Sequence, residues 1–172
     1  MRRKLQNSEL NRLSVEQFKQ VPKLPVVVVL DNVRSQHNIG AAFRTGDAFR
    51  IESIFLCGIS ATPPNAEIHK SALGAEDSVD WQHFETAIDA INFLKKNDYK
   101  IISIEQTDDS VMLNNFVFET DKKYALVFGN EVRGVSQPAV DASDLCIEIP
   151  QEGTKHSLNV SVSVGIVLWE FY

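Results

Sequence analysis

Short runs of apolar residues alternate along this chain with segments of helical periodicity. The first run, Val26 to Leu30, is continuous and β-branched, which is typical of a strand buried on both faces of a parallel sheet. An amphipathic stretch from Ile39 to Phe49 follows, with Asn38 at its predicted N-cap, and then a second apolar run from Ser53 to Cys57 that Gly58 closes. The first part of the chain therefore predicts a strand, a helix and a strand.

The alternation continues toward the C-terminus. The further predicted elements are a helix from Thr86 to Asn97, strands from Lys100 to Glu105, Tyr124 to Phe128 and Leu145 to Ile149, and a short helix after Ser136. Residues 60–77 and 106–120 are rich in Pro, Asp, Asn and Thr, so we expect long connections there. This order of elements predicts an α/β domain with a mainly parallel sheet and helices on both faces.

The last stretch, Ser157 to Tyr172, has a mixed pattern. Val160, Val162 and Val164 alternate with serines, as they would in a strand. However, the stretch is long for a strand, and Gly165 would weaken one. We therefore expect a helix, which the resemblance described below also implies.

The chain has 172 residues, enough for one domain with its own core. We expect residues 1–24 to be a short basic helical extension and residues 25–172 to form the main domain. Ser14 to Gln17 fits a capping box, and Pro22 and Pro25 mark the junction. The first 23 residues hold six basic and two acidic side chains, so the rest of a chain of net charge −6 carries −10. The basic arm is either a solvated helix or a segment that binds phosphates.

The remaining composition excludes several classes of protein. Cys57 and Cys146 each lie in an apolar run without metal-ligand spacing, so we expect two reduced thiols in the core. The four histidines show no metal-ligand spacing either, and we predict no metal. No apolar run is long enough for a signal peptide or a membrane span, which favours a cytoplasmic protein.

The glycine turns indicate where a ligand binds. The chain has no G-x-G, and Gly129 to Gly134 has P-loop spacing but is followed by Val135-Ser136, so both common nucleotide-binding fingerprints are absent. Gly129 and Gly153 each follow one of the last two predicted strands. Open α/β sheets bind ligands at that end of their strands, so we expect a cleft there.

Three segments, each just after a predicted strand, carry a more specific signal. They are Asn38 to Arg44, Phe128 to Ser136, and Ile149-Pro150 leading through Gly153 to Ser157-Leu158-Asn159-Val160-Ser161. In this order they resemble the three motifs of the SpoU/TrmH branch of the SPOUT methyltransferases, which transfer a methyl group from S-adenosylmethionine to RNA ribose. The resemblance extends from Pro25 to Tyr172.

The resemblance implies a fold and a set of site residues. It implies a deep trefoil knot near the C-terminus, in which S-adenosyl-L-methionine binds, and a homodimer with the helix after Asn38 and the C-terminal helix with Trp169 and Phe171 at its interface. The expected cofactor-binding residues are Ile104, Gly129, Glu131, Ile149, Pro150, Ser157 and Leu158. The expected catalytic residues are Asn38, Arg44, Ser157 and Asn159. Arg44 is also an expected RNA contact. Because they are positively charged, we expect Arg2, Arg3, Lys4 and Arg12 of the basic arm to contact RNA as well.

The family's proposed catalytic centre matches Arg44. A guanidinium group hardly ever loses its proton, so binding a phosphate and stabilising the developing alkoxide is physically easier for Arg44 than acting as a base. The chain is similar to the compact members that act on tRNA, which makes tRNA the expected substrate. Methylation of rRNA, a non-catalytic RNA-binding relative and an unrelated α/β nucleotide-binding domain are the alternatives.

Overall fold

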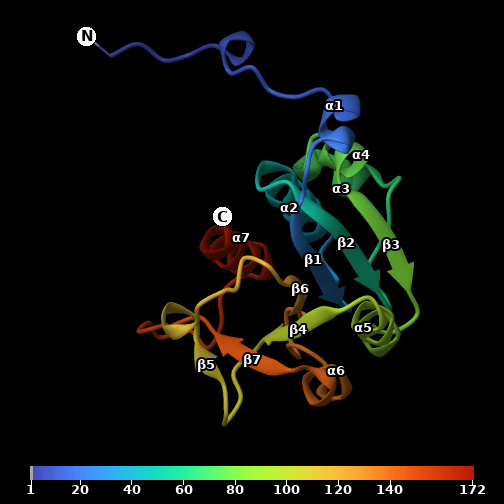
Figure 1. Ribbon diagram of the computed structural model, residues 1–172, viewed down its shortest axis with the longest axis vertical. Helices are drawn as coiled ribbons and strands as arrows, with labels where there is room; N and C mark the ends of the chain where they lie inside the picture. The colour runs from blue at the N-terminus through green and yellow to red at the C-terminus, as the bar shows by residue number, and fades with distance from the viewer. Residues whose placement is uncertain (1) are drawn as a thin grey trace.

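The computed structural model describes residues 2–172 and contains a seven-stranded sheet of order β3-β2-β1-β6-β4-β7-β5 (Figure 1). Every pair of neighbouring strands in this sheet is parallel. The strands are β1 (Leu24–Asp31), β2 (Ile51–Cys57), β3 (Asp80–Phe84), β4 (Tyr99–Ile104), β5 (Val111–Met112), β6 (Lys123–Phe128) and β7 (Leu145–Glu148). The predicted α/β domain with a mainly parallel sheet is confirmed.

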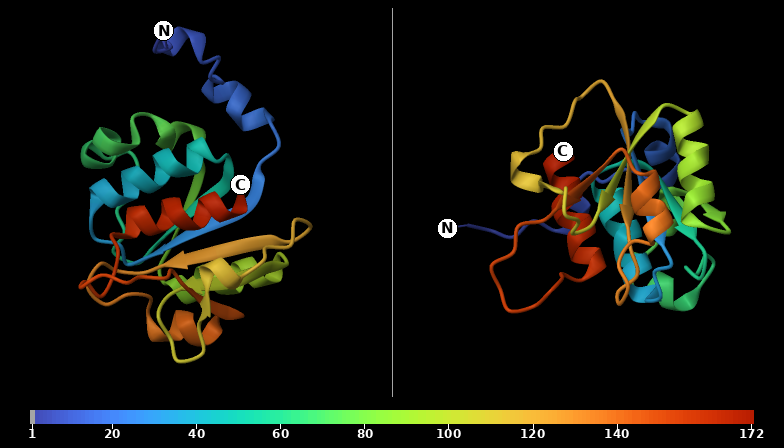
Figure 2. Two further views of the ribbon diagram at one scale, coloured as in Figure 1. Left: turned by 90° about the vertical axis from the view of Figure 1, so that its left-hand side faces the viewer. Right: turned by 90° about the horizontal axis from the view of Figure 1, so that it is seen from below.

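Helices cover both faces of the sheet (Figure 2). They are α1 (Val15–Gln20), α2 (Gln36–Ala48), α3 (Ala66–Ala72), α4 (Ala75–Ser78), α5 (Ala87–Lys96), α6 (Gln137–Ala142) and α7 (Val160–Phe171), with short 3-10 helices at Asn7–Glu9 and Leu113–Asn115. The residues of β1 alternate between the two faces. Val26, Val28 and Leu30 belong to the core under α2, α3 and α7, whereas Val27 and Val29 belong to the core under α5 and α6. This alternation explains why β1 is apolar throughout.

Helix α2 begins earlier than its amphipathic pattern indicates. Its N-cap is Ser35, whose Oγ accepts a hydrogen bond from the backbone N–H of Asn38 at 3.2 Å. The prediction of Asn38 as the N-cap is therefore wrong. Asn38 lies in the first turn of the helix, where its side chain is buried and available for contacts outside the helix.

The two segments expected to be long connections contain regular structure. Residues 60–77 include α3 and most of α4, and residues 106–120 include β5 and a 3-10 helix, so both predictions were wrong in this respect. Asn65 caps α3 by accepting hydrogen bonds from two backbone N–H groups. The helix packs closely against α2 because Gly40 has no side chain: a Cβ there would lie 2.3 Å from the carbonyl oxygen of Ile68. These short helices are stabilised mainly by tertiary packing, because their sequences carry no strong helical pattern.

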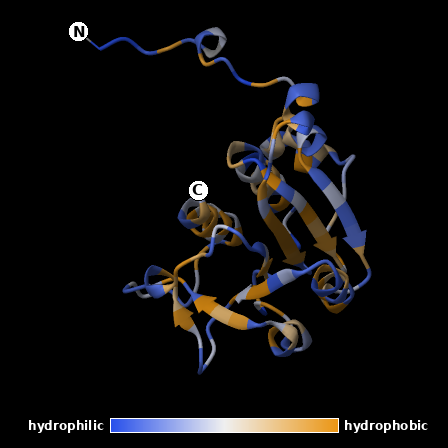
Figure 3. Ribbon diagram, in the orientation of Figure 1, coloured by the Kyte–Doolittle hydropathy of each residue, from blue (hydrophilic) through white to orange (hydrophobic). Residues whose placement is uncertain are grey.

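The C-terminal stretch is a helix, as expected, despite its alternating valines and serines. Asn159 is its N-cap, and the buried side chains Val160, Val164, Val167 and Leu168 follow helical spacing. Figure 3 shows α7 and the central strands as mostly hydrophobic. Phe171 is half-buried against the core, with its ring centroid 5.1 Å from that of Tyr124, and its expected place at a dimer interface stays a prediction.

The N-terminal segment is held to the body by α1. The predicted capping box is confirmed, since Ser14 and Gln17 each accept a hydrogen bond from the other's backbone N–H. Phe18 of α1 is buried in the core, whereas the residues before α1 extend away from the body (Figure 1). None of the helices in the described part of the chain has the length and apolarity needed to cross a membrane.

Both cysteines lie in strands, Cys57 in β2 and Cys146 in β7, and both are buried free thiols, as expected. Burial raises the pKa of Cys57 to about 12 and also raises the pKa of Cys146 above its ordinary value. Thiols with raised pKa values are poor nucleophiles at neutral pH, so neither cysteine is a candidate for chemistry.

Candidate functional site

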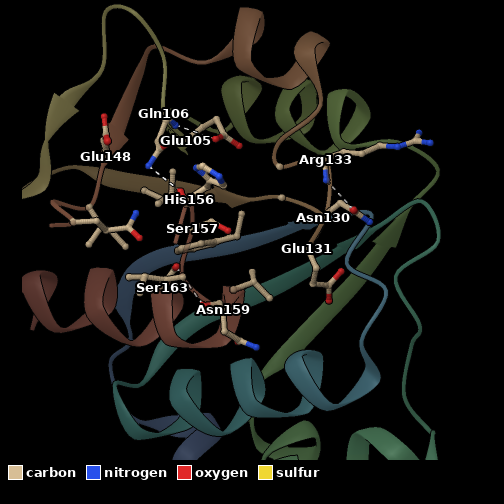
Figure 4. A pocket seen from close by; sticks show the side chains of 18 of the residues that line it. Glu105, Gln106, Asn130, Glu131, Arg133, Glu148, His156, Ser157, Asn159 and Ser163 are labelled. Carbon is tan, nitrogen blue, oxygen red and sulfur yellow. Dashed lines mark hydrogen bonds between the residues drawn. The ribbon is translucent and has the colours of Figure 1, made fainter. Parts of the chain in front are cut away.

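A cleft of about 510 Å³ lies at the ends of β4, β6 and β7 (Figure 4). Its walls are residues 104–106 after β4, residues 128–134 after β6, residues 147–149 and 151 at the end of β7, and residues 156–160 with Ser163 at the start of α7. The volume falls in the range of small-molecule sites, and its position is where parallel sheets bind ligands. The cleft lies where the glycine turns predict it.

The loop after β6 forms one rigid wall of this cleft. Asn130 and Gly134 exchange two backbone hydrogen bonds of 2.9 Å, and the Asn130 side chain accepts from the N–H groups of Val132 and Arg133. A Cβ on Gly129 would lie 2.0 Å from the backbone of Gly134, so only glycine fits there. The loop is thus a small closed ring whose shape is set before any ligand binds.

Two carboxylates outside the three motif segments fix the end of this loop. Glu105 accepts a 2.8 Å hydrogen bond from the N–H of Val135, and Asp31 accepts one of 2.8 Å from the next N–H, that of Ser136. Glu105 reaches its partner because Gly134 has no side chain: a Cβ there would lie 2.2 Å from Oε2. Asp31 is almost fully buried at the end of β1. No sequence motif marks Glu105 or Asp31, because their hydrogen-bond partners are 30 and 105 positions away in the chain.

A chain of hydrogen bonds joins the three motif segments. The Asn159 amide nitrogen donates to Asn38 Oδ1 at 3.1 Å, and Asn38 Nδ2 donates to Glu131 Oε1 at 3.0 Å. A carboxylate only accepts, so Asn38 must turn its nitrogen to Glu131 and its oxygen to Asn159. The Asn159 oxygen is then left to accept from the backbone and hydroxyl of Ser161 at the start of α7. Asn38, Glu131 and Asn159 are all predicted from the sequence as site residues, and in the structure their side chains lie together.

Glu131 also holds the segment that leads into α2. Its carboxylate accepts hydrogen bonds of 3.0 Å from the backbone N–H groups of Arg34 and Ser35. Burial raises the pKa of Glu131, but the hydrogen bonds from these two amides, from its own N–H and from Asn38 outweigh burial, and the pKa lies below its ordinary value. Glu131 lines the cleft, as expected, yet its carboxylate is already bound by the protein.

The other expected cofactor residues lie mostly in the cleft. Its lining includes Ile104, Gly129, Ile149, Ser157 and Leu158, but Pro150 is exposed and lies outside the lining. Gln106 and His156 also line the cleft, and Gln106 Nε2 donates to the His156 carbonyl at 3.3 Å. Nothing in the sequence pattern singled out this pair.

The expected catalytic residues occupy different positions relative to the cleft. Ser157 and Asn159 line it, and Asn38 reaches it through Asn159 and Glu131. Arg44 lies outside the lining, on the exposed side of α2. Its guanidinium group makes no hydrogen bond or ion pair with any other residue between 2 and 172. Arg44 is therefore free to meet a molecule that approaches α2 from solvent.

The expected RNA contacts in the arm are far from the cleft in this structure (Figure 1). Arg2, Lys4 and Arg12 are exposed, and Arg3 forms a 2.7 Å ion pair with Glu9. Among residues 2–172, the structure contains no group of three or more His, Cys, Asp or Glu side chains that could hold a metal ion.

This chain is similar to a known protein family and to several of its members. Residues 25–169 match the sequence model of the SpoU rRNA Methylase family. RlmB from Nitrosomonas europaea, a 23S rRNA (guanosine-2′-O-)-methyltransferase, is 34% identical over 151 residues, which cover 86% of this chain and 55% of that protein. The chain spans 55 to 62% of the length of this and the next curated relatives.

Solved structures agree with this match. The A. aeolicus TrmH/SpoU tRNA modifying enzyme superposes with a TM-score of 0.79 at 27% identity, over 91% of this chain and 80% of that chain. An AdoMet-bound rRNA methyltransferase from Sinorhizobium meliloti superposes with the same TM-score at 25% identity, over 93% of this chain and 60% of that chain.

The lowered pKa of Glu131 makes its contribution to stability depend on pH. The carboxylate stabilises the folded chain above its unfolded pKa, and this contribution is lost as pH falls through the lowered folded pKa. We expect Glu131→Gln to be less stable than the wild type at pH 7 and the gap to close below a pH of about 4. Thermal melts from pH 7 to pH 3 measure the gap. Glu85→Gln, at an exposed carboxylate, is the matched control, and a Glu131→Gln gap that stays constant over this range would contradict the prediction.

Proposed function

The chain belongs to the SpoU rRNA Methylase family, and we propose that it is an S-adenosylmethionine-dependent methyltransferase acting on the 2′-hydroxyl of an RNA ribose. The observation that carries the proposal is the hydrogen-bond chain from Asn159 through Asn38 to Glu131. It gathers all three motif segments at the mouth of one cleft. The name of the RlmB relative, which specifies a guanosine 2′-O-methyltransferase, supports the ribose as the target.

The residues of the cleft fit S-adenosylmethionine. Ile104, Ile149 and Leu158 offer apolar surface for an adenine ring, while the rigid loop after Gly129 presents backbone groups to its edge. The solved AdoMet-bound relative supports this choice of cofactor. When bound, the cofactor supplies a methyl group on a positively charged sulfur.

The side chains around the cleft have separate tasks in this proposal. Ser157 lines the cleft, and no side-chain hydrogen bond within residues 2–172 engages its hydroxyl, so it can contact the ribose. Asn38 is committed to Glu131 and Asn159, so it positions the site and does not act on the substrate directly. Arg44 stands outside and is suited to a phosphate or a developing alkoxide. Most of the rate enhancement then comes from alignment.

We also propose the trefoil knot that the resemblance implies. After β7 at one side of β4, the chain returns to place α7 against the face of the sheet covered by α2 (Figure 2). The bond between Asn159 and Asn38 fixes the start of that helix beside α2. A crystal structure traced through residues 129–160 tests the threading.

Transfer RNA is the favoured substrate, with ribosomal RNA as the second candidate. The solved tRNA modifying enzyme, which is 27% identical over 91% of this chain, supports tRNA as the substrate. The name of the RlmB relative, which is 34% identical over 86% of this chain, supports rRNA as the second candidate.

Methyl transfer is the direct test of the proposed function. The purified protein is incubated with methyl-labelled S-adenosylmethionine and bulk tRNA or rRNA, and the labelled nucleotide is then mapped. We expect label on a ribose 2′-oxygen of tRNA and none on the corresponding 2′-deoxy substrate. Equal labelling of DNA or protein would refute the ribose assignment, and binding of RNA without any methyl transfer would favour a non-catalytic relative.

Arg44 is the residue for which a catalytic and a structural role predict different outcomes. We expect Arg44→Ala to lose about 100-fold or more in single-turnover methyl transfer, the effect of removing one donor that stabilises a transition state. Arg44→Lys should recover little, because an ammonium group lacks the planar two-donor fork. The melting temperature should hardly change, since the side chain is exposed and has no hydrogen bond or ion pair to lose within residues 2–172. Near wild-type chemistry in Arg44→Ala would remove the catalytic assignment.

We propose that residues 1–24 are an RNA-binding extension of the methyltransferase domain formed by residues 25–172. The exposed Arg2, Lys4 and Arg12 make no ion pair among the described residues, and the ion pair of Arg3 with Glu9 is exposed and therefore weak. Deleting residues 1–13 keeps α1 and Phe18 in place. It should weaken binding of bulk tRNA and flatten its salt dependence, while the affinity for S-adenosylhomocysteine stays unchanged. If the salt dependence of tRNA binding is unaltered by the deletion, the arm is only a solvated segment and does not bind RNA.

We propose a homodimer in which α7 packs against a second copy. Val162 is 49% exposed and Trp169 is 66% exposed, and their spacing of seven residues puts both on one side of α7 with the half-buried Ile166. Light scattering at micromolar concentration should give the mass of two chains, and Trp169→Glu should shift it toward one. A wild-type monomer would contradict the proposal.

A further inference from the structure

The arginines of this chain are unevenly distributed. Three of the seven are in the arm, and the body of residues 24–172 contains only four: Arg34, Arg44, Arg50 and Arg133. Arg34 precedes Ser35, the N-cap of α2, Arg44 lies on α2, and Arg133 belongs to the loop after β6 that lines the cleft. Three of four arginines in a body of net charge −10 therefore gather on two segments beside the cleft.

The two segments are held together by the hydrogen bonds that build the site. The backbone N–H of Arg34 donates to Glu131, and the Asn130 side chain donates to the carbonyl of Asn32 at 2.7 Å. The N–H of Arg133 donates to Asn130 in the same closed loop. Arg34 and Arg133 are thus anchored by their backbones to one rigid junction, while both side chains are exposed. Figure 4 shows the Arg133 side chain directed outward from the loop, away from Ser157.

The protein does not neutralise these guanidinium groups itself. Within residues 2–172, none of Arg34, Arg44 and Arg133 forms an ion pair, although acidic residues outnumber basic ones in the body. Glu131, which lies two positions before Arg133 and binds the backbone of Arg34, is occupied by backbone amides and Asn38. Several of the lysines, in contrast, pair with carboxylates at other places on the surface. Arginines left unpaired on a rigid support suit bidentate binding of phosphate.

We propose that Arg34 and Arg133 bind backbone phosphates of the RNA strand and that, together with Arg44, they form an arginine edge along the α2 side of the cleft. This inference rests on the proposed function, since it names how the substrate of the same site is held. Arg34 and Arg133 act on affinity through phosphate contacts, which carry no sequence information.

Substitution of single arginines tests the inference on the full chain. Binding of fluorescently labelled bulk tRNA is measured over a range of salt concentrations for Arg34→Ala and Arg133→Ala. Each should weaken binding about tenfold, the effect of losing a charge-assisted contact, and lower the salt slope by about one. Arg34→Lys and Arg133→Lys should keep most of the slope. Arg50→Ala, which removes the same charge at the far end of α2, is the matched control and should change neither quantity.

The affinity for S-adenosylhomocysteine and the melting temperature are measured on every variant and should stay at the wild-type values. Wild-type RNA affinity and salt slope in both alanine variants would overturn the inference, and so would an equal loss in Arg50→Ala. A loss of S-adenosylhomocysteine affinity would instead make these residues part of the cofactor loop. If the wild type methylates RNA while the variants bind it normally, the proposed function survives; if the wild type neither binds nor methylates RNA, both fail.

Discussion

The hydrogen-bond chain through Asn38 is the interaction on which the rest of the site depends. Its two amide groups have one possible orientation, because Glu131 can only accept. Hydrogen bonds through this one side chain connect the loop after β6, the start of α2 and the start of α7. These hydrogen bonds join residues 93 and 121 positions apart in the chain, so the three segments cannot shift independently of one another.

Several carboxylates in this protein hold backbone segments in place by hydrogen bonds, in addition to contributing negative charge. Asp31, Glu105 and Glu131 each accept hydrogen bonds from backbone N–H groups in or beside the loop that forms the cleft wall. A loop that bends sharply leaves amide groups without partners, and a negatively charged acceptor satisfies them strongly. The acidic composition, which taken alone argues against an RNA partner, is thus partly explained by structural acids. The one arginine that lines the described cleft, Arg133, is exposed.

How far the sequence predicts this structure depends on how local each signal is. The apolar run of β1 and the turn glycines after β6 are local signals, and the strand, the loop and the position of the cleft follow from them. The short helix α3 depends on its fit against Gly40 of α2, which no local pattern shows. Asp31 and Glu105 are not predicted as site residues for the same reason. A carboxylate at the end of a strand is typical of the protein surface, and the sequence does not show the distant backbone amides that it binds. Asn38 is a predicted site residue, but its prediction as the N-cap of α2 is wrong. The residue type alone does not distinguish an asparagine that caps a helix from a buried asparagine that links two segments.

Helix α2 separates the residues that stabilise the fold from the arginine that we propose to bind the substrate. Its inward side is packed through Ile39, Gly40 and Phe43, and its first turn is tied to Glu131. Its outward side carries the exposed Arg44, whose guanidinium group forms no hydrogen bond or ion pair within residues 2–172. A charged side chain on a rigid support loses little flexibility of the backbone when it meets a phosphate, so the cost of binding falls mainly on its own rotamers. The same inward contacts that position Asn38 therefore also fix the helix from which, in the proposed function, Arg44 meets the phosphate.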